Sequence, residues 1–106
     1  MTTFDKREEG FEKKFALDED QKFRAEARRN KLLGLWVAEK QGMSGDAAAA
    51  YASEVVAADF EPGGGGAVRK VTADLGASGV AVTERELRAK MEELMALAIA
   101  QVKAGT

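Results

Sequence analysis

The strongest constraint on this chain is the segment Glu61 to Gly66, which reads Glu-Pro-Gly-Gly-Gly-Gly. Four consecutive glycines lose too much backbone entropy to remain in a helix, and Pro62, the single proline, cannot continue one. We therefore expect a mobile loop at residues 62–66. Elsewhere alanine, leucine, glutamate and lysine dominate, and these residues favour helices. The segment thus predicts an all-α protein with helices on both sides of a loop.

Apolar residues recur at helical spacing in four places, two on each side of this loop. The first predicted helix covers Phe23 to Gln41, and the fourth carries the clearest stripe. The stripes are Phe23, Ala27, Asn30, Gly34, Val37 and Ala38; then Ala47, Tyr51, Val55 and Ala58; then Val68, Val71, Thr72 and Leu75; and finally Leu87, Met91, Leu94, Met95, Ala98 and Val102. We expect these helices to form a four-helix bundle over residues 19–104.

Local signals support these helices. Ser44 is expected to cap the second helix, and Thr83 with Glu86 forms a capping box for the fourth. Val80 to Val82 is read as a connector, since a lone segment cannot form a sheet. The run from Leu32 to Trp36 is apolar on all sides, which indicates burial by several neighbours. Asn30 lies on the buried stripe, so it must find hydrogen-bond partners and is expected to set the register of the bundle.

Composition excludes several classes of function. The chain has no cysteine and no histidine, so thiolate and imidazole chemistry is missing; we expect no enzyme, no metal site and no required cofactor. A net charge of −2 with mixed signs predicts no nucleic-acid binding. The longest apolar run, Leu32 to Ala38, is far shorter than the roughly 20 residues that cross a bilayer. Because Met1 to Gly10 lacks a secretory signal, we expect a cytoplasmic protein without membrane insertion.

Residues 1–18, the N-terminal arm, form a separate unit. Phe4, Phe11 and Phe15 align within about 40° on a helical wheel, but polar residues from Asp18 to Lys22 interrupt the stripe. A helix this short is marginal in water, so we expect the arm to order on a partner. Four acidic and four basic residues balance between Asp5 and Lys14, which suits a protein groove better than a membrane. The pattern also fits phenylalanines that fold back over the bundle.

A basic cluster precedes the only tryptophan. Arg28, Arg29 and Lys31 lie before Trp36, and cations beside an aromatic ring can hold a phosphate and stack a base. The alternative is that the cations form a solvated face and Trp36 is part of the core. The glycines at 63–66 do not form a phosphate loop, because the Lys and Ser or Thr that should follow are absent.

Several stretches of the chain resemble one family. They are Met1-Thr2-Thr3-Phe4-Asp5-Lys6-Arg7-Glu8, Phe11-Glu12-Lys13-Lys14-Phe15-Ala16 and Ala27-Arg28-Arg29-Asn30-Lys31-Leu32-Leu33-Gly34-Leu35-Trp36, with further likeness in Tyr51 to Asp59 and Leu87 to Met91. The sequence is similar to the zeta subunit of the α-proteobacterial F-type ATP synthase.

This resemblance implies a protein that blocks ATP hydrolysis by the catalytic sector of the synthase, to which it binds at the membrane periphery. It assigns Phe4, Lys6, Arg7, Phe11, Lys13, Lys14 and Phe15 to an inhibitory segment. It also implies ADP or ATP as a regulatory ligand, for which Arg28, Arg29, Lys31 and Trp36 are our candidates. The alternative function is a nucleotide-sensing or adaptor bundle that binds another protein.

Overall fold

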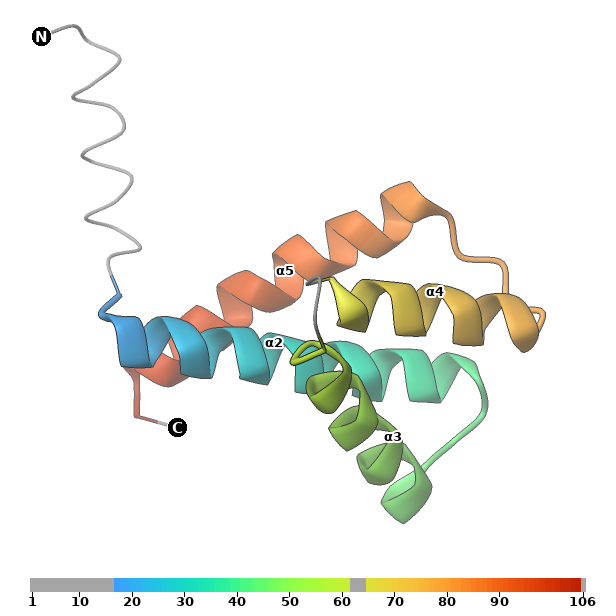
Figure 1. Cartoon of the computed structure of the whole chain (residues 1–106), viewed down its shortest axis with the longest axis horizontal. Coiled ribbons are helices and arrows are strands. Elements are labelled where there is room, and N and C mark those ends of the chain that lie inside the picture. Colours follow the sequence, from blue (N-terminus) through green and yellow to red (C-terminus); the bar gives the residue numbers. More distant parts are fainter. Residues whose placement is uncertain (1–16, 62–64, 106) are drawn as a thin grey trace, which may run out of the picture.

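The structure is a computed structural model that describes residues 17–61 and 65–105, and within these ranges it contains four helices (Figure 1). They are α2 (Glu19–Lys40), α3 (Gly45–Ala58), α4 (Gly66–Ala77) and α5 (Glu84–Lys103). No described residue forms a strand, and Val80 to Val82 is a connector. The predicted all-α fold of four packed helices is therefore confirmed.

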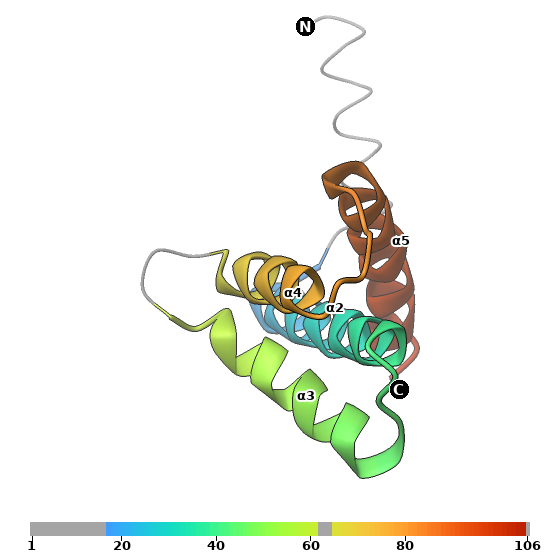
Figure 2. The ribbon, with the colours of Figure 1, turned by 90° about the vertical axis from the view of Figure 1, so that its right-hand side faces the viewer.

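Helix α2 is the centre of the fold. Among the helices of the described residues, it alone contacts each of the other three, and Figure 2 shows α3, α4 and α5 arranged around it. Its fully buried side chains Leu33 and Val37 pack with Val55 from α3 and Val71 from α4. No residue from Leu32 to Ala38 is exposed. The predicted burial of this run on several sides is thus confirmed, because helices cover α2 from several directions.

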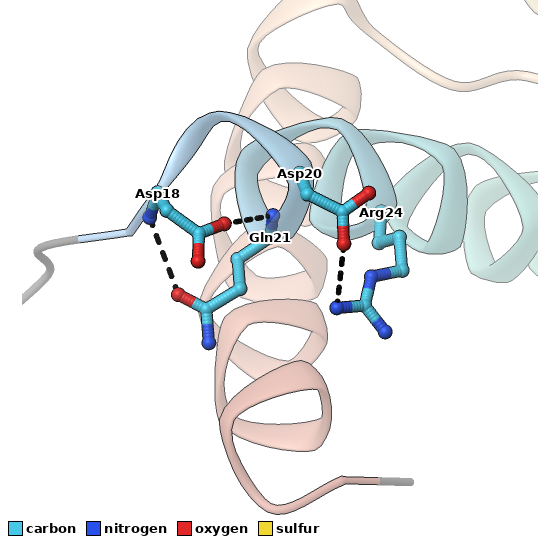
Figure 3. A network of polar contacts seen from close by, with 4 residues as sticks. All are labelled: Asp18, Asp20, Gln21 and Arg24. Atoms are coloured by element: carbon cyan, nitrogen blue, oxygen red, sulfur yellow. Dashed lines mark hydrogen bonds and ion pairs between the residues drawn. The ribbon is translucent and has the colours of Figure 1, made fainter.

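The first turn of α2 is held by a capping box that the apolar pattern does not reveal. The Gln21 backbone N–H donates to Asp18 Oδ1 at 2.7 Å, and the Asp18 backbone N–H donates to Gln21 Oε1 at 3.2 Å (Figure 3). Asp20 pairs with Arg24 at 2.8 Å, one helical turn later. The polar residues that interrupt the stripe are therefore a helix N-terminus. The prediction that this helix begins at Phe23 is wrong by four residues.

Four members of the predicted stripes are exposed: Phe23, Ala47, Val68 and Thr72. Phe23 lies on the side of α2 opposite the fully buried Ala25, and α3 is rotated so that Ala48 and Ala52 are buried instead of Ala47. Helical spacing predicts an apolar stripe, but the positions of the neighbouring helices determine which residues at its margins are buried. The stripe of α5 is confirmed, since Leu87, Leu94 and Ala98 are buried and the other three members are half-buried. Its capping box is also confirmed, with Glu86 N–H donating to Thr83 Oγ1 at 3.1 Å.

The glycine run ends inside a helix. Gly65 adopts φ 66°, and Gly66 is the first residue of α4, so the expected loop at 62–66 is one residue too long. A Cβ at Gly66 would collide with the carbonyl oxygen of Ala58. Because Gly65 has no side chain to cap the helix, Asp59 does so from a distance: its Oδ1 accepts the Ala67 N–H at 3.3 Å.

Asn30 is buried and hydrogen-bonded, as the sequence predicts. Only 2% of its surface is exposed. Its Nδ2 donates to Asp59 Oδ2 at 3.1 Å, and its Oδ1 accepts from Arg29 Nε and Nη2, both at 3.2 Å. Asp59 follows α3 directly and also caps α4. The pair therefore joins α2 to the ends of two other helices.

A second polar cluster joins α3 to α4. The Tyr51 hydroxyl donates to Asp74 Oδ2 at 2.7 Å, and Lys70 Nζ lies 3.2 Å from the same oxygen and 5.2 Å from the Tyr51 ring centroid. Burial, and then the hydrogen bond to the Asp74 carboxylate, raise the pKa of the Tyr51 phenol well above its usual value. The cluster thus depends on a protonated phenol.

Replacing Gly34 with alanine is expected to destabilise the protein. A Cβ at Gly34 would lie 2.6 Å from Ala52 Cα, so α2 and α3 would have to separate. Overpacking costs roughly 1–3 kcal/mol, whereas the gain in helix propensity is about 1 kcal/mol. We expect Gly34→Ala to lower the free energy of unfolding in urea. The matched control is Gly76→Ala in α4, where no atom lies within 4 Å; it should leave stability unchanged or raise it. Equal stabilities of the two variants would contradict this account of the helix crossing.

The Tyr51 cluster predicts a loss of stability in alkali. The folded pKa is raised above the unfolded value of about 10, so the stabilisation is complete below that pH and is lost as the pH rises above it. We expect the free energy of unfolding of the wild type to fall more steeply above about pH 10 than that of Tyr51→Phe. Tyr51 is the only tyrosine, so phenolate absorbance reports its ionisation directly. A phenol that titrates normally in the folded chain would refute the prediction.

Candidate functional site

The predicted inhibitory segment lies outside the described residues. Its members are Phe4, Lys6, Arg7, Phe11, Lys13, Lys14 and Phe15. The description begins at Leu17, immediately before the Asp18 cap of α2. The role of these residues, and the division of the chain at residue 18, therefore stay predictions. The structure does describe the surface that follows them along the chain.

A shallow hollow of about 510 Å³ lies on the N-terminal half of α2, and we call it the basic groove. It is lined by Arg24, Ala27, Arg28, Lys31, Leu32, Leu35, Val56 and Gln101. Three of these residues carry positive charge, and none is acidic. The leucines and Val56 are half-buried, whereas Arg24 and Lys31 are exposed, so cations surround an apolar floor. Such a groove favours a ligand that combines negative charge with apolar surface.

The spacing of the cations along α2 builds this groove. Arg24, Arg28 and Lys31 are separated by four and three residues, which places them on one face of the helix. Arg28 Nη1 donates to Gln101 Oε1 of α5 at 3.1 Å, which holds the guanidinium against the neighbouring helix. Arg24 is anchored more weakly, by its exposed pair with Asp20. The groove therefore contains one cation held against a neighbouring helix, Arg28, and two exposed cations, Arg24 and Lys31.

The structure brings two of the four nucleotide candidates together, Arg28 and Lys31. The other two, Arg29 and Trp36, do not line the basic groove. Arg29 donates to Asn30, as described above. Nucleotide binding stays a prediction for all four residues.

Trp36 is engaged by other parts of the chain. It is half-buried against the core, and its ring centroid lies 4.9 Å from Lys40 Nζ and 5.6 Å from Lys90 Nζ. These two lysines are arranged for cation–π contact with the indole. Trp36 thus contacts Lys90 of α5 and is one of the partly buried residues around the core.

Sequence reasoning named two of the eight groove residues as binding candidates and missed six, among them Arg24, Val56 and Gln101. Arg24 had a usable signal, because it continues the spacing of Arg28 and Lys31 backwards by one turn. Val56 and Gln101 had none, since they come from α3 and α5 and meet α2 only after folding.

Two features are absent from the described part of the chain. No helix there is both long and apolar enough to span a bilayer. Residues 17–61 and 65–105 also contain no cluster of three or more acidic side chains placed to bind a metal ion.

Comparison with known proteins places the chain in a family. A family model described as "ATPase inhibitor subunit zeta" matches residues 1–101. A solution NMR structure is similar to this chain with 56% sequence identity and a TM-score of 0.67, over 79% of this chain and 96% of that one. No curated protein matches. Since the family model covers nearly the whole sequence, the chain belongs to the ATPase inhibitor subunit zeta family, whose members are regulatory proteins rather than enzymes.

Proposed function

We propose that this protein inhibits ATP hydrolysis by the F-type ATP synthase, and that its N-terminal arm carries the inhibition by binding the catalytic sector. The observation that carries the proposal is the extent of the family match, which includes the arm as well as the four helices. The arm supplies phenylalanines at helical spacing and balanced charges, a pattern typical of a segment that docks into a protein groove.

The structure supports separate roles for the arm, which is proposed to inhibit, and for the four helices, which form a folded scaffold. The core cluster is built from residues between Leu33 and Leu94, and α2 has its own capping box at Asp18. The Asp18 cap and the core cluster thus lie within the described helices. A scaffold of this kind can present the arm without depending on it.

Deleting residues 1–16 is expected to abolish inhibition while leaving the four helices folded. The reason is that the deletion removes all seven residues of the predicted segment and spares Asp18 and the core. The assay is ATP hydrolysis by the purified catalytic sector with increasing amounts of full chain or deleted chain. Circular dichroism and urea unfolding serve as the folding control.

The variant Phe11→Ala keeps the full length of the arm and removes one aromatic side chain. It therefore tests whether inhibition depends on that side chain or only on the presence of the arm. It should weaken inhibition by about tenfold or more, as for an aromatic residue central to an interface. Undiminished inhibition by the well-folded deleted chain would overturn the proposed role of the arm.

The basic groove supports a second role, the binding of ADP or ATP as a regulatory ligand. Arg28 and Lys31 can receive the phosphates, while Leu32, Leu35 and Val56 offer an apolar surface to the base. The fixed guanidinium of Arg28 favours bidentate contact with a phosphate, and exposed Lys31 adds a movable charge. The proposal concerns regulation of the bundle, and it leaves inhibition itself to the arm.

Titration with ADP or ATP is expected to shift the backbone amides of the groove residues saturably, as followed by NMR. Lys31→Gln should weaken binding by about tenfold, because it removes a cation next to the phosphates. The matched control is Lys22→Gln, which is also exposed and lies on the opposite side of the same helix. Trp36 fluorescence provides a second readout outside the groove. A saturable shift confined to residues around Trp36, or no shift at all, would exclude the groove as the nucleotide site.

A further inference from the structure

Two phenylalanines lie exposed and in contact near the start of α2. Phe23 is 55% exposed and Phe60 is 63% exposed, and their ring centroids are 5.8 Å apart with the planes tilted by 44°. Phe23 comes from the start of α2, and Phe60 follows the end of α3. A preformed aromatic pair offers large apolar area at little cost in side-chain entropy, which is typical of a protein contact.

This pair and the basic groove form one continuous surface. A second hollow of about 230 Å³ is lined by Phe23, Glu26, Ala27, Asn30, Val56, Asp59 and Phe60. It shares Ala27 and Val56 with the basic groove. We call the combined surface the aromatic-basic face. It runs from the exposed ring pair, across a small apolar floor, to the cations of α2.

The charges of this face indicate what it binds. Arg24, Arg28 and Lys31 lie together on its groove side. On its aromatic side lie two carboxylates: the exposed Glu26, and Asp59, which keeps its charge because the groups that donate to it, the Asn30 amide and the Ala67 N–H, are neutral. Cations therefore predominate only on the groove side, which favours a partner that presents acidic side chains there.

The position of the face along the chain indicates where its partner lies. Helix α2 begins at Glu19, so Phe23 and Arg24 follow the arm within about two helical turns. When the arm is bound to the catalytic sector, as proposed above, Phe23 and Arg24 must therefore lie close to the same partner. The larger hollow of about 740 Å³ between α4 and α5 lacks these features, because no aromatic side chain lines it and its one cation, Arg88, lies beside two acidic residues, Glu84 and Glu92.

We propose that the aromatic-basic face docks on the catalytic sector, against a protein segment that presents acidic side chains beside an apolar patch. This inference rests on the proposed function, and it adds a second contact to that of the arm. Phe23 and Phe60 supply the apolar anchor, and Arg24, Arg28 and Lys31 pair with the carboxylates. Because Arg28 and Lys31 are also the cations proposed for the nucleotide, the nucleotide and this partner exclude each other. The two contacts act together, because Phe23 follows the arm by five residues in the sequence, so binding of one contact raises the local concentration of the other at its site.

The test measures the dissociation constant between the full chain and the purified catalytic sector. The double variant Phe23→Ser, Phe60→Ser should raise it by about 30-fold, since two interface anchors are lost. Arg24→Glu should raise it by about tenfold at low salt, with a smaller effect at high salt because exposed charges are screened. All three side chains are largely exposed, so the fold should survive, and circular dichroism checks this.

Matched controls come from α5. Leu97→Ser replaces a side chain that is 46% exposed, and Arg85→Glu reverses an exposed charge; both should leave the dissociation constant within about twofold of the wild type. Wild-type affinity in the folded double variant would overturn the docking proposal, whereas loss of inhibition on arm deletion would still uphold the proposed function. Failure of the wild-type chain to bind the sector would overturn both. A dimer that the double variant dissociates, seen by sedimentation equilibrium, would show that a second copy covers the face.

Discussion

The carboxylate of Asp59 is the contact on which the arrangement of three helices depends. One oxygen accepts from the buried Asn30 of α2, and the other accepts the Ala67 N–H in the first turn of α4. Asp59 itself ends α3. A buried asparagine without partners would be costly, and a helix that begins with glycine has no cap of its own. One side chain meets both needs, so the glycine-rich connection can enter α4 without a local capping residue.

Around this contact, α2 packs against each of the other three helices and determines how closely they approach. Gly34 allows the backbone of α3 to approach closely at Ala52, and Leu33 and Val37 fill the space between the elements. The same helix leaves its solvent-facing side open between α3 and α5, where cations lie over half-buried leucines. Packing and candidate binding thus occupy different faces of one helix, so surface changes at Arg24 or Lys31 need not disturb the core.

Much of the fold could be predicted from local patterns. The stripe of α5 and the Thr83 and Glu86 capping box follow from spacing alone, because they involve residues within one helix. The start of α2 was missed even though Asp18 and Gln21 form the same kind of box. The apolar stripe begins at Phe23, yet the helix begins where its N–H groups find acceptors. The candidate site was predicted in part, through Arg28 and Lys31 on one helix.

The sequence by itself determined that the chain is helical, where its helices lie to within a few residues, and, through long motifs, its family. These properties depend on backbone propensity and on spacing within short segments. Only the tertiary structure decided that Arg28 meets Gln101, that Lys90 of α5 reaches the Trp36 ring, and that Phe23 and Phe60 form an exposed pair. Each of these contacts joins residues from different elements, or depends on how a neighbouring helix is rotated. A linear pattern carries no information about that rotation until packing selects it.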